Sequence, residues 1–317
     1  MSLAANPSYD LIIIGSGPAG LSAALYAARE GLRVIVLEKY VVGGMAAITD
    51  TIDNYPGFEN GVGGLELADH LFYHAKRFGA QVRSGIEATG LSRAKHIITV
   101  KTTAEKLTAH AVLIATGSAY KTLGVPGEAE FTGRGVHFCA TCDAPLYKDK
   151  DVLVIGGGNA AIQEAIFIAK FARQITFLIR GPKLGGSTVL RKQIEALPHI
   201  EYKFNTQVTA VTHDTHRVTG VDTTAGHIST DGLFVFIGLL PNTQVFAETL
   251  ELDAQNFLVT QPDFSTNLPG VFGAGDVRAG STWQIASAVG EGASASLHIR
   301  RYLDELRYRE HHAQGQH

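Results

Sequence analysis

Residues 9–20 read YDLIIIGSGPAG, an apolar run rich in β-branched residues that ends in a loop with three glycines. The run predicts a short buried strand over residues 9–15. The next segment, GLSAALYAARE over residues 20–30, has helical spacing and many good helix formers. Residues 32–38, LRVIVLE, predict a second strand. This order of strand, turn, helix and strand predicts a parallel pair with a right-handed crossover.

The same unit appears a second time, with a strand predicted over residues 151–156, a helix over 159–171 and a strand over 174–179. The two copies begin about 140 residues apart, which is a domain spacing and not a solenoid repeat. Further elements are predicted elsewhere: strands over 96–101, 111–115, 207–211 and 233–238, and a closing helix over 287–306.

The first glycine loop has the spacing of a dinucleotide-binding turn. Gly15 permits the tight turn, Gly17 lets a pyrophosphate approach the backbone, and Gly20 lets the helix pack on the sheet. The phosphate then meets free N–H groups at the positive end of the helix. Glu38 ends the second strand, where it can accept hydrogen bonds from ribose hydroxyls. The competing interpretation is a glycine turn that binds nothing.

The second glycine loop consists of Gly156, Gly158 and Ala161, and alanine is an accepted variant at its third position. We expect this loop to be a pyrophosphate site as well. No carboxylate ends the strand that follows it. Arg180 stands there instead, and it either meets a phosphate or forms a solvated strand end.

The totals describe a globular chain of 317 residues, long enough for two domains with real cores. The net charge of −3 gives no reason to expect nucleic acid or an anionic membrane as a partner. The N-terminal residues lack the pattern of a signal peptide, and the apolar run 11–14 is too short to span a bilayer. With two cysteines in all, the chain is expected to be cytoplasmic.

Both cysteines lie in the stretch HFCATCDAP, residues 137–145. A Cys-x-x-Cys pair is either half of a metal site or a dithiol that opens and closes during catalysis. A structural disulfide is disfavoured, because the loop it closes is too short to constrain much of the chain. Zinc is also disfavoured, because His137 offers a third ligand but no second Cys/His pair completes the site.

Six motifs occur in a characteristic order: GSGPAG (15–20), NYPGF (54–58), ATG (115–117), CATCD (139–143), GGGNAA (156–161) and GAGD (273–276). On these motifs the chain resembles the low-molecular-weight thioredoxin reductases over nearly its whole length. The resemblance implies an α/β fold of two Rossmann-like three-layer domains. The FAD domain would comprise residues 1–117 and 244–317, and a nucleotide-binding-like domain, 118–243, would carry the cysteine pair. Homodimers are also implied.

The resemblance assigns roles to the cysteine motif. Cys139 would attack the disulfide of a thioredoxin-like partner, Cys142 would face the flavin, and Asp143 would protonate the leaving thiolate. This fits the chemistry of a dithiol at an accessible turn, with one sulfur attacking and the other resolving. A second interpretation of Asp143, as a helix N-cap or turn acceptor, remains open.

Further positions are assigned to FAD binding by the same resemblance: Asn54, Thr116, Gly117, Asp276, Gln284 and Ile285. Asn54 would lie beside the flavin ring, and Asp276 would bond the ribityl chain. Gln284 and Ile285 would bring a helix start to the pyrimidine side of the ring, where the helix end stabilises the negative charge of reduced flavin.

The chain departs from the family where NADPH would bind. Relatives that use NADPH carry His-Arg-Arg-x-x-x-Arg after the second strand of that domain, and residues 179–185 retain only Arg180, with Arg191 further along. The lost guanidinium groups are the strongest contacts to a 2′-phosphate. Met45 and Trp283 also place apolar side chains where the family has polar ones near the flavin.

We therefore predict a flavoprotein disulfide oxidoreductase whose electron donor is not NADPH. The donor would be a protein such as ferredoxin, or a second FAD in the second nucleotide site, although NAD(P)H at that site remains open. A different class of function, a non-catalytic flavin redox sensor, also fits the same residues.

Overall fold

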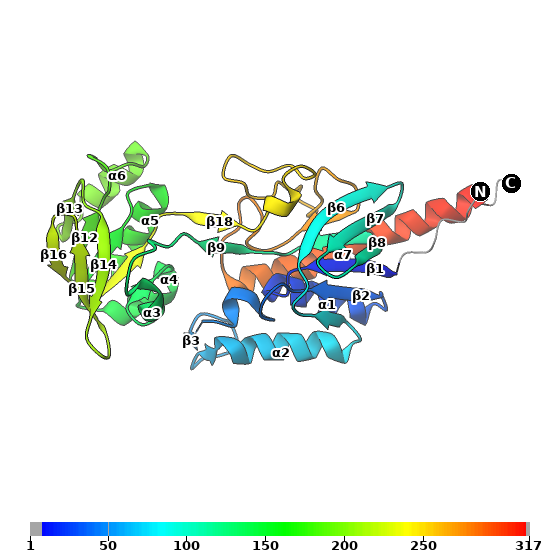
Figure 1. Ribbon diagram of the computed structural model, residues 1–317, viewed down its shortest axis with the longest axis horizontal. Helices are drawn as coiled ribbons and strands as arrows, with labels where there is room; N and C mark the ends of the chain where they lie inside the picture. The colour runs from blue at the N-terminus through cyan, green and yellow to red at the C-terminus, as the bar shows by residue number, and fades with distance from the viewer. Residues whose placement is uncertain (1–7, 50, 315–317) are drawn as a thin grey trace. The chain divides into compact units, whose positions relative to one another are not determined.

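The computed structural model describes residues 8–49 and 51–314 (Figure 1). The chain divides into two compact units, one formed by residues up to 119 together with those from 241, the other by residues 120–240. The chain passes between them at β9 (Ser118–Tyr120) and β18 (Leu239–Pro241), which pair with each other. These crossings lie within a few residues of the domain boundaries expected from the sequence.

Within the described residues, the first unit has a seven-stranded sheet in the order β5, β2, β1, β8, β7, β6, with β19 also paired to β8. The strands are β1 (Tyr9–Ile14), β2 (Val34–Leu37), β5 (Gln81–Arg83), β6 (Ala88–Ala94), β7 (Ile97–Thr102), β8 (Lys106–Ile114) and β19 (Val271–Gly273). Strand β1 pairs in parallel with β2 and β8, whereas β6, β7 and β8 form an antiparallel meander. The parallel half of the sheet therefore holds the first glycine loop.

Both faces of β1 are covered, which explains its uninterrupted apolar sequence. Leu11 and Ile13 belong to a core shared with the helices, whereas Ile12 and Ile14 belong to a second core on the meander side. Successive side chains of a strand point to opposite faces. All four side chains are therefore buried, and the unit has three layers.

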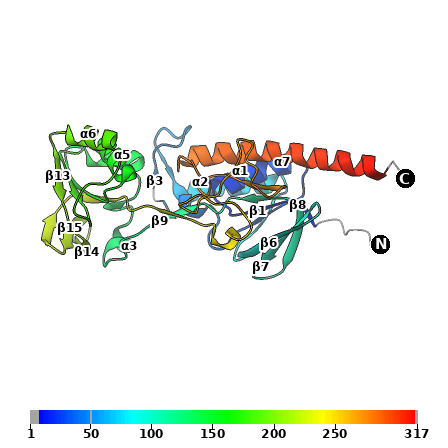
Figure 2. The same cartoon turned by 90° about the horizontal axis from the view of Figure 1, so that it is seen from above.

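The helices of the first unit are α1 (Pro18–Arg29), α2 (Gly64–Arg77) and α7 (Ile285–Gln314), with short 3-10 turns η1 (Gly44–Ala46) and η3 (Gln244–Phe246). A small hairpin joins β3 (Thr51–Ile52) to β4 (Val62–Gly63). Figure 2 shows α1 and α7 side by side on one face of the sheet. A Cβ on Gly292 would overlap the carbonyl oxygen of Ala19, so this glycine permits the close contact between α7 and α1.

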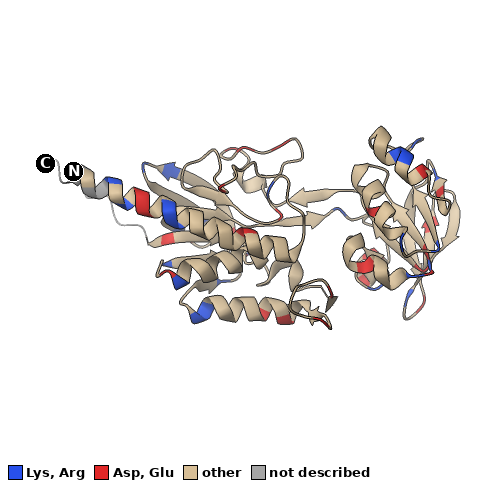
Figure 3. Ribbon diagram, turned by 180° about the vertical axis from the view of Figure 1, so that it is seen from behind, with Lys and Arg blue, Asp and Glu red and all other residues tan. Residues whose placement is uncertain are grey.

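Charged residues occur along the C-terminal part of α7, which Figure 3 colours blue and red. Arg300 pairs with Asp304 at 2.9 Å, and Arg309 lies 3.7 Å from Glu305, both with the i,i+4 spacing that supports a solvated helix. Across residues 8–49 and 51–314, no helix combines the length and the apolar character needed to cross a membrane.

The second unit, described throughout, has a parallel sheet in the order β10, β17, β11, β12, β13 beside an antiparallel sheet β14, β15, β16. The strands are β10 (Val136–His137), β11 (Asp151–Ile155), β12 (Gln174–Leu178), β13 (Ile200–Lys203), β14 (Val208–His213), β15 (Val218–Thr223), β16 (Gly226–Ser229) and β17 (Gly232–Val235). Its helices are α3 (Glu128–Phe131), α4 (Ala140–Asp143), η2 (Ala144–Tyr147), α5 (Asn159–Ile168) and α6 (Thr188–Glu195). Val154 faces the helical layer and Leu153 the antiparallel sheet, so this unit is also three-layered.

The predicted α/β class with Rossmann-like parallel sheets is confirmed. The helix of the first unit begins at Pro18, two residues before the predicted start, because proline suits the first turn, where its missing N–H has no partner to lose. In the second unit α5 ends at Ile168, and the predicted residues beyond it form a turn.

Candidate active site

In the first glycine loop, the two outer glycines have no room for a side chain, whereas the middle one does. Gly15 has φ +103°, and a Cβ there would overlap the carbonyl oxygen of Ala115. A Cβ on Gly20 would overlap the carbonyl oxygen of Gly15. At Gly17, by contrast, a Cβ would meet no described atom within 4 Å. The fold therefore requires glycine at the outer positions, whereas Gly17 keeps space free at the start of α1.

The second glycine loop repeats this arrangement. Gly156 has φ +135°, and a Cβ there would overlap the carbonyl oxygen of Phe236. A Cβ on Gly158 would have no neighbour within 4 Å in the described chain. Ala161 is fully buried, so the second loop accommodates a methyl group at the position where the first loop requires Gly20. Both loops thus present a bare backbone at the start of a helix.

Glu38 is a buried carboxylate held against the first loop. Its Oε2 accepts hydrogen bonds from the backbone N–H of Ser16 at 2.9 Å and from the Ser16 hydroxyl at 2.7 Å. Its Oε1 accepts from the N–H of Tyr40 at 2.8 Å. A carboxylate has roughly four acceptor sites, so one remains for a ribose hydroxyl. The sequence did not reveal Ser16 as the residue that fixes this side chain.

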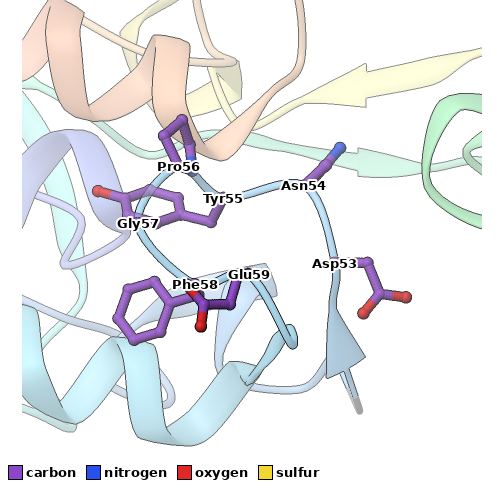
Figure 4. Close-up of a pocket in the computed structure, with 7 residues that line it drawn as sticks. All are labelled: Asp53, Asn54, Tyr55, Pro56, Gly57, Phe58 and Glu59. Carbon is purple, nitrogen blue, oxygen red and sulfur yellow. The ribbon is translucent and has the colours of Figure 1, made fainter.

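Asn54 and Gln284 meet although 230 positions separate them. The Asn54 amide donates a hydrogen bond to Oε1 of Gln284 at 3.1 Å. Asn54 also lines an open pocket formed by residues 53–59 (Figure 4). Ile285 begins α7 directly after Gln284 and packs against a small core that includes Ile52. Two predicted flavin contacts are therefore side by side.

The two unusual apolar residues are both accessible. Met45 lies in η1 with 49% of its surface exposed, and Trp283 is 40% exposed. Trp283 has φ +51°, a backbone conformation that a bulky residue rarely adopts. Its ring lies 6.0 Å from that of Phe257, centroid to centroid. Neither side chain is therefore a core residue.

Asp276 follows β19 and lies largely buried. Burial raises its pKa to about 6, a hydrogen bond from the Ser281 hydroxyl at 3.2 Å opposes the rise, and the charge of Glu291 adds to it. Glu291 itself accepts from the N–H of Gly275 at 2.7 Å and pairs with Arg278 at 2.9 Å. A buried carboxyl of this kind is stabilised by further donors, such as hydroxyl groups of a ligand.

Thr116 and Gly117 are tied to Asn242. The Thr116 hydroxyl donates to the carbonyl oxygen of Asn242 at 2.7 Å, and the Asn242 amide donates to the carbonyl oxygen of Thr116 at 2.8 Å. The N–H of Asn242 donates to the carbonyl oxygen of Gly117 at 3.0 Å. These bonds join two chain segments where the first unit ends and resumes. Their place in the structure thus gives Thr116 and Gly117 a structural role.

The residues of the first unit fit a bound FAD. The backbone at Gly17 and the start of α1 suit a pyrophosphate, since Gly17 has no side chain and a Cβ there would have no neighbour within 4 Å in the described chain. Glu38 retains an acceptor site for a ribose hydroxyl. The buried carboxyl of Asp276 suits a polyol chain, because hydroxyl donors offset its desolvation. These protein groups together match the pyrophosphate, ribose and polyol chain of FAD.

Cys139 and Cys142 are joined by a disulfide, with their Cα atoms 5.4 Å apart. Cys139 is the N-cap of α4, where its Sγ accepts from the N–H of Cys142 at 3.2 Å. Both cysteines are partly exposed, and Thr141 between them is exposed. The sulfurs are bonded to each other, so they are not metal ligands here. A disulfide at an accessible turn is the arrangement that thiol–disulfide exchange requires.

Asp143 turns its side chain toward a buried histidine. Its Oδ2 lies 3.2 Å from Nδ1 of His137, and its own N–H donates to the carbonyl oxygen of Cys139 at 3.2 Å. Asp143 precedes η2, yet within the described residues its side chain makes no capping hydrogen bond there. Asp143 thus stands at the N-cap position of η2, but its carboxyl is directed to His137 and, in the part of the chain that the structure describes, makes no capping hydrogen bond.

Two more side chains make hydrogen bonds to the cysteine turn or to His137 beside it, and neither was predicted from the sequence. Tyr147 bonds through its hydroxyl to Nε2 of His137 at 2.8 Å. Glu164 on α5 accepts a hydrogen bond from the N–H of Ala140 at 3.2 Å, and burial raises the pKa of its carboxyl, an effect this bond opposes. Perturbed carboxyls beside a redox pair are a mark of functional sites.

The second nucleotide loop has a single arginine at the strand end. Arg180 is exposed after β12, and Arg191 on α6 lies with its guanidinium 3.4 Å from the Thr188 hydroxyl. The following segment folds back on the loop: the N–H of Gly185 donates to the carbonyl oxygen of Gly157 at 2.8 Å. The N–H of Ser187 donates to Oδ1 of Asn159 at 2.8 Å.

Known proteins are similar to this chain in sequence and in fold. The pyridine nucleotide-disulphide oxidoreductase family model matches residues 9–292. The thioredoxin reductase of Bacillus subtilis is 37% identical over 304 residues, covering 94% of this chain and 96% of that protein. The Treponema pallidum thioredoxin reductase is 38% identical over 304 residues, covering 94% and 98%. The crystal structure of thioredoxin reductase from Streptococcus pyogenes matches with a TM-score of 0.89 at 34% identity, covering 94% and 98%. The chain therefore belongs to the pyridine nucleotide-disulphide oxidoreductase family, as an FAD-dependent disulfide oxidoreductase of the low-molecular-weight thioredoxin reductase kind.

Proposed function

We propose that this enzyme passes electrons through the Cys139–Cys142 pair to the disulfide of a thioredoxin-like protein. The observation that carries the proposal is the partly exposed disulfide at the start of α4, with the Asp143 carboxyl turned toward His137. We also propose a homodimer in the cytoplasm, from the resemblance to homodimeric relatives and from a redox pair suited to a reducing compartment.

FAD, when bound, supplies the electron pair that reduces the disulfide. We propose that the first unit holds it: the backbone around Gly17 receives the pyrophosphate, and Glu38 accepts from the ribose. Asp276 accepts from the ribityl hydroxyls, and the Asn54–Gln284 pair contacts the ring. Gly15 and Gly20 act by shaping the loop, Thr116 and Gly117 by fixing the neighbouring segments, and Ile285 by setting the start of α7.

The reduction of the partner disulfide proceeds in two thiol–disulfide exchange steps. The Cys139 thiolate attacks one sulfur of the partner disulfide, forming a mixed disulfide and expelling the other partner sulfur as a thiolate. Cys142, as a thiolate, then attacks Cys139, which restores the disulfide seen in the structure and releases the second partner thiolate. Asp143 gives a proton to a leaving thiolate and is reprotonated from solvent. The partner gains two electrons, and the dithiol loses two.

Turnover separates the enzyme from a redox sensor. FAD-loaded protein, photoreduced under anaerobic conditions with a continuous light-driven reductant, is mixed with an oxidised thioredoxin, and partner thiols are counted. The proposal predicts many thiol pairs per chain, and none from Cys139→Ser. At most one pair per chain would identify a stoichiometric switch and overturn the proposal.

We further propose that NADPH is a poor donor. A charge-assisted hydrogen bond contributes roughly 1.5–3 kcal/mol, and two of the three expected arginines are absent. Their loss lowers affinity on the order of a hundredfold or more. NADH gains nothing, because Ile179 and Arg180 offer no carboxylate to its 2′-hydroxyl. The donor is then a one-electron protein such as ferredoxin, or a second FAD held at Gly156, Gly158 and Ala161.

Rapid mixing with excess NADPH tests the donor proposal. Slow or absent bleaching of the flavin supports it, provided that the chemically reduced protein still reduces its partner. Bleaching within milliseconds would show that the missing arginines are dispensable. Counting flavin released per denatured chain then distinguishes the two remaining donors, since two per chain indicates a second FAD and one indicates a protein donor.

A further inference from the structure

His137 lies at the centre of a buried chain of polar groups beneath the cysteine turn. The residue ends β10 and is only 4% exposed. Its Nδ1 lies 3.2 Å from Oδ2 of Asp143, and its Nε2 lies 2.8 Å from the hydroxyl of Tyr147. The rings of Tyr147 and Phe234 pack against the imidazole with centroids 5.2 and 5.3 Å away. The ring is therefore held at both nitrogens and packed against two aromatic rings.

The Asp143 carboxylate sets the direction of the two hydrogen bonds that His137 makes. An ionised carboxylate can only accept, so with Asp143 ionised the proton of the neutral imidazole sits on Nδ1. Nε2 then accepts from the Tyr147 hydroxyl. Burial, followed by the charges of Asp143 and Asp231, raises the pKa of Tyr147, so this hydroxyl keeps its proton. Tyr147 thus selects the ring tautomer that donates to Asp143.

The chain also accommodates a protonated Asp143. With one more proton, the carboxyl O–H donates to Nδ1, the ring proton sits on Nε2, and the Tyr147 oxygen accepts. Both states of the carboxyl therefore have a partner in the same geometry. This matters because a proton donor must give up its proton and recover it without moving.

We propose that His137, oriented by Tyr147, is a positioning residue that holds the Asp143 carboxyl and stabilises its ionised form after proton transfer to a leaving thiolate. The role of Asp143 in that transfer rests on the function proposed above. The arrangement resembles the way a second hydrogen bond fixes the tautomer and orientation of a functional histidine elsewhere.

Other charged and titratable groups surround this chain on each packed element. Lys150 lies with its Nζ 5.3 Å from the centroid of the Tyr147 ring. The negative charge of Asp231, just before β17, contributes to the raised pKa of Tyr147. Glu164 on α5 bonds to α4 at Ala140. Several charged groups therefore act near the cysteine turn, and the test must report on the Asp143 carboxyl alone.

The test follows the Asp143 carboxyl directly in the full-length, FAD-loaded, oxidised protein. Aspartate labelled with ¹³C at the side-chain carboxyl is incorporated, and Asp143→Asn identifies the Asp143 carboxyl signal by its absence. His137→Leu removes the donor, His137→Asn supplies an amide N–H close to the place of Nδ1, and Tyr147→Phe keeps the imidazole but removes its orienting hydroxyl. Flavin retention and circular dichroism confirm that each variant is folded.

The Nδ1–H donor holds the Asp143 carboxyl in place, so its loss should change the surroundings of the labelled carbon. We expect the Asp143 carboxyl signal to move in His137→Leu. The change should be smaller in Tyr147→Phe and near zero in His137→Asn. An unchanged signal in His137→Leu, or equal changes in His137→Leu and His137→Asn, overturns the proposal.

A second readout uses the reaction of the disulfide with dithiothreitol, followed by alkylation and mass spectrometry. The alkaline limb of its rate profile should move upward in His137→Leu and stay in place in His137→Asn; a limb that moves in neither overturns the proposal. Neither measurement needs an electron donor or a protein partner. A protein that shows the His137 effect but no thioredoxin turnover refutes the function proposed above and leaves the positioning role intact.

Discussion

The side-chain amide of Asn54 donates a hydrogen bond to Oε1 of Gln284 across 3.1 Å. The two residues come from the two separate chain segments of the first unit, one from the β3–β4 hairpin and the other just before α7. Both belong to the group that we propose holds the flavin ring. Because they contact each other, the proposed flavin-ring site depends on both segments.

This pairing predicts non-additive mutations. Asn54→Ala and Gln284→Ala should each weaken FAD binding, because each loses its own ligand contact and also releases its partner from a fixed position. The double variant should lose less than the sum, with a coupling of about 0.5–1 kcal/mol for one neutral hydrogen bond. Fluorescence titration of the apoproteins with FAD measures all four affinities. Strict additivity would show that the bond does not organise the site.

Gly17→Val should abolish FAD binding while leaving the apoprotein folded. The valine Cβ meets open space within the described structure, and the backbone of Gly17, with φ −67° and ψ −178°, suits any residue. Its cost is a weaker helix cap, roughly 1 kcal/mol. Gly20→Val is the matched control, since its Cβ overlaps the Gly15 carbonyl oxygen and should destabilise the fold itself. Urea unfolding and visible absorbance separate the two effects.

The two cysteine variants should differ, although both stop disulfide reduction. In Cys142→Ser, Cys139 should be trapped as a mixed disulfide with a thioredoxin, because no second thiolate resolves it. In Cys139→Ser, the remaining Cys142 thiolate should give a long-wavelength band with oxidised flavin. Mass spectrometry of the trapped peptide and an absorbance spectrum check the pair. Trapping through Cys142 alone would reverse the assigned roles.

Asp276 should make the apoprotein less stable as the pH rises from about 4 to about 6. Its folded pKa of about 6 exceeds the ordinary value of 3.8, so in that window the folded state binds more protons than the unfolded state. Stability therefore falls with rising pH and levels off above 6. Asp276→Asn should remove about 2 kcal/mol of this dependence and weaken FAD binding. Urea titrations at pH 4.5 and 7.5 provide the comparison, and an identical pH dependence in both proteins would contradict it.

Gly181→Arg should improve NADPH binding by restoring one guanidinium group. A Cβ at Gly181 meets no atom of the described structure within 4 Å, whereas one on Gly185 would crowd the Gly157 carbonyl oxygen at 2.7 Å. One charge-assisted contact corresponds to roughly tenfold or more in affinity. Gly181→Gln, similar in length but uncharged, is the control. Stopped-flow reduction over a range of NADPH concentrations reports the change, and equal behaviour of both variants would remove phosphate recognition as the cause.

The sequence by itself determined the two strand–glycine loop–helix units, the isolated Cys-x-x-Cys pair and the family. These features are local. Apolar periodicity specifies strands and helices within short windows, and the glycine spacing of each loop is read from six consecutive residues. Even there the sequence placed the start of α1 two residues late, because helical periodicity does not register a proline that opens the first turn.

Only the tertiary structure decided which polar side chains meet. Asn54 reaches Gln284, Glu38 bonds Ser16, and His137 joins Asp143 to Tyr147. These contacts depend on how strands and helices pack and on the rotamers that burial allows, and neither is encoded in residue spacing. The same packing buries Asp276 and Glu164 and raises the pKa of each. The pKa of a carboxyl group rises because its neighbours exclude water from it, so the shift appears only when the chain has folded.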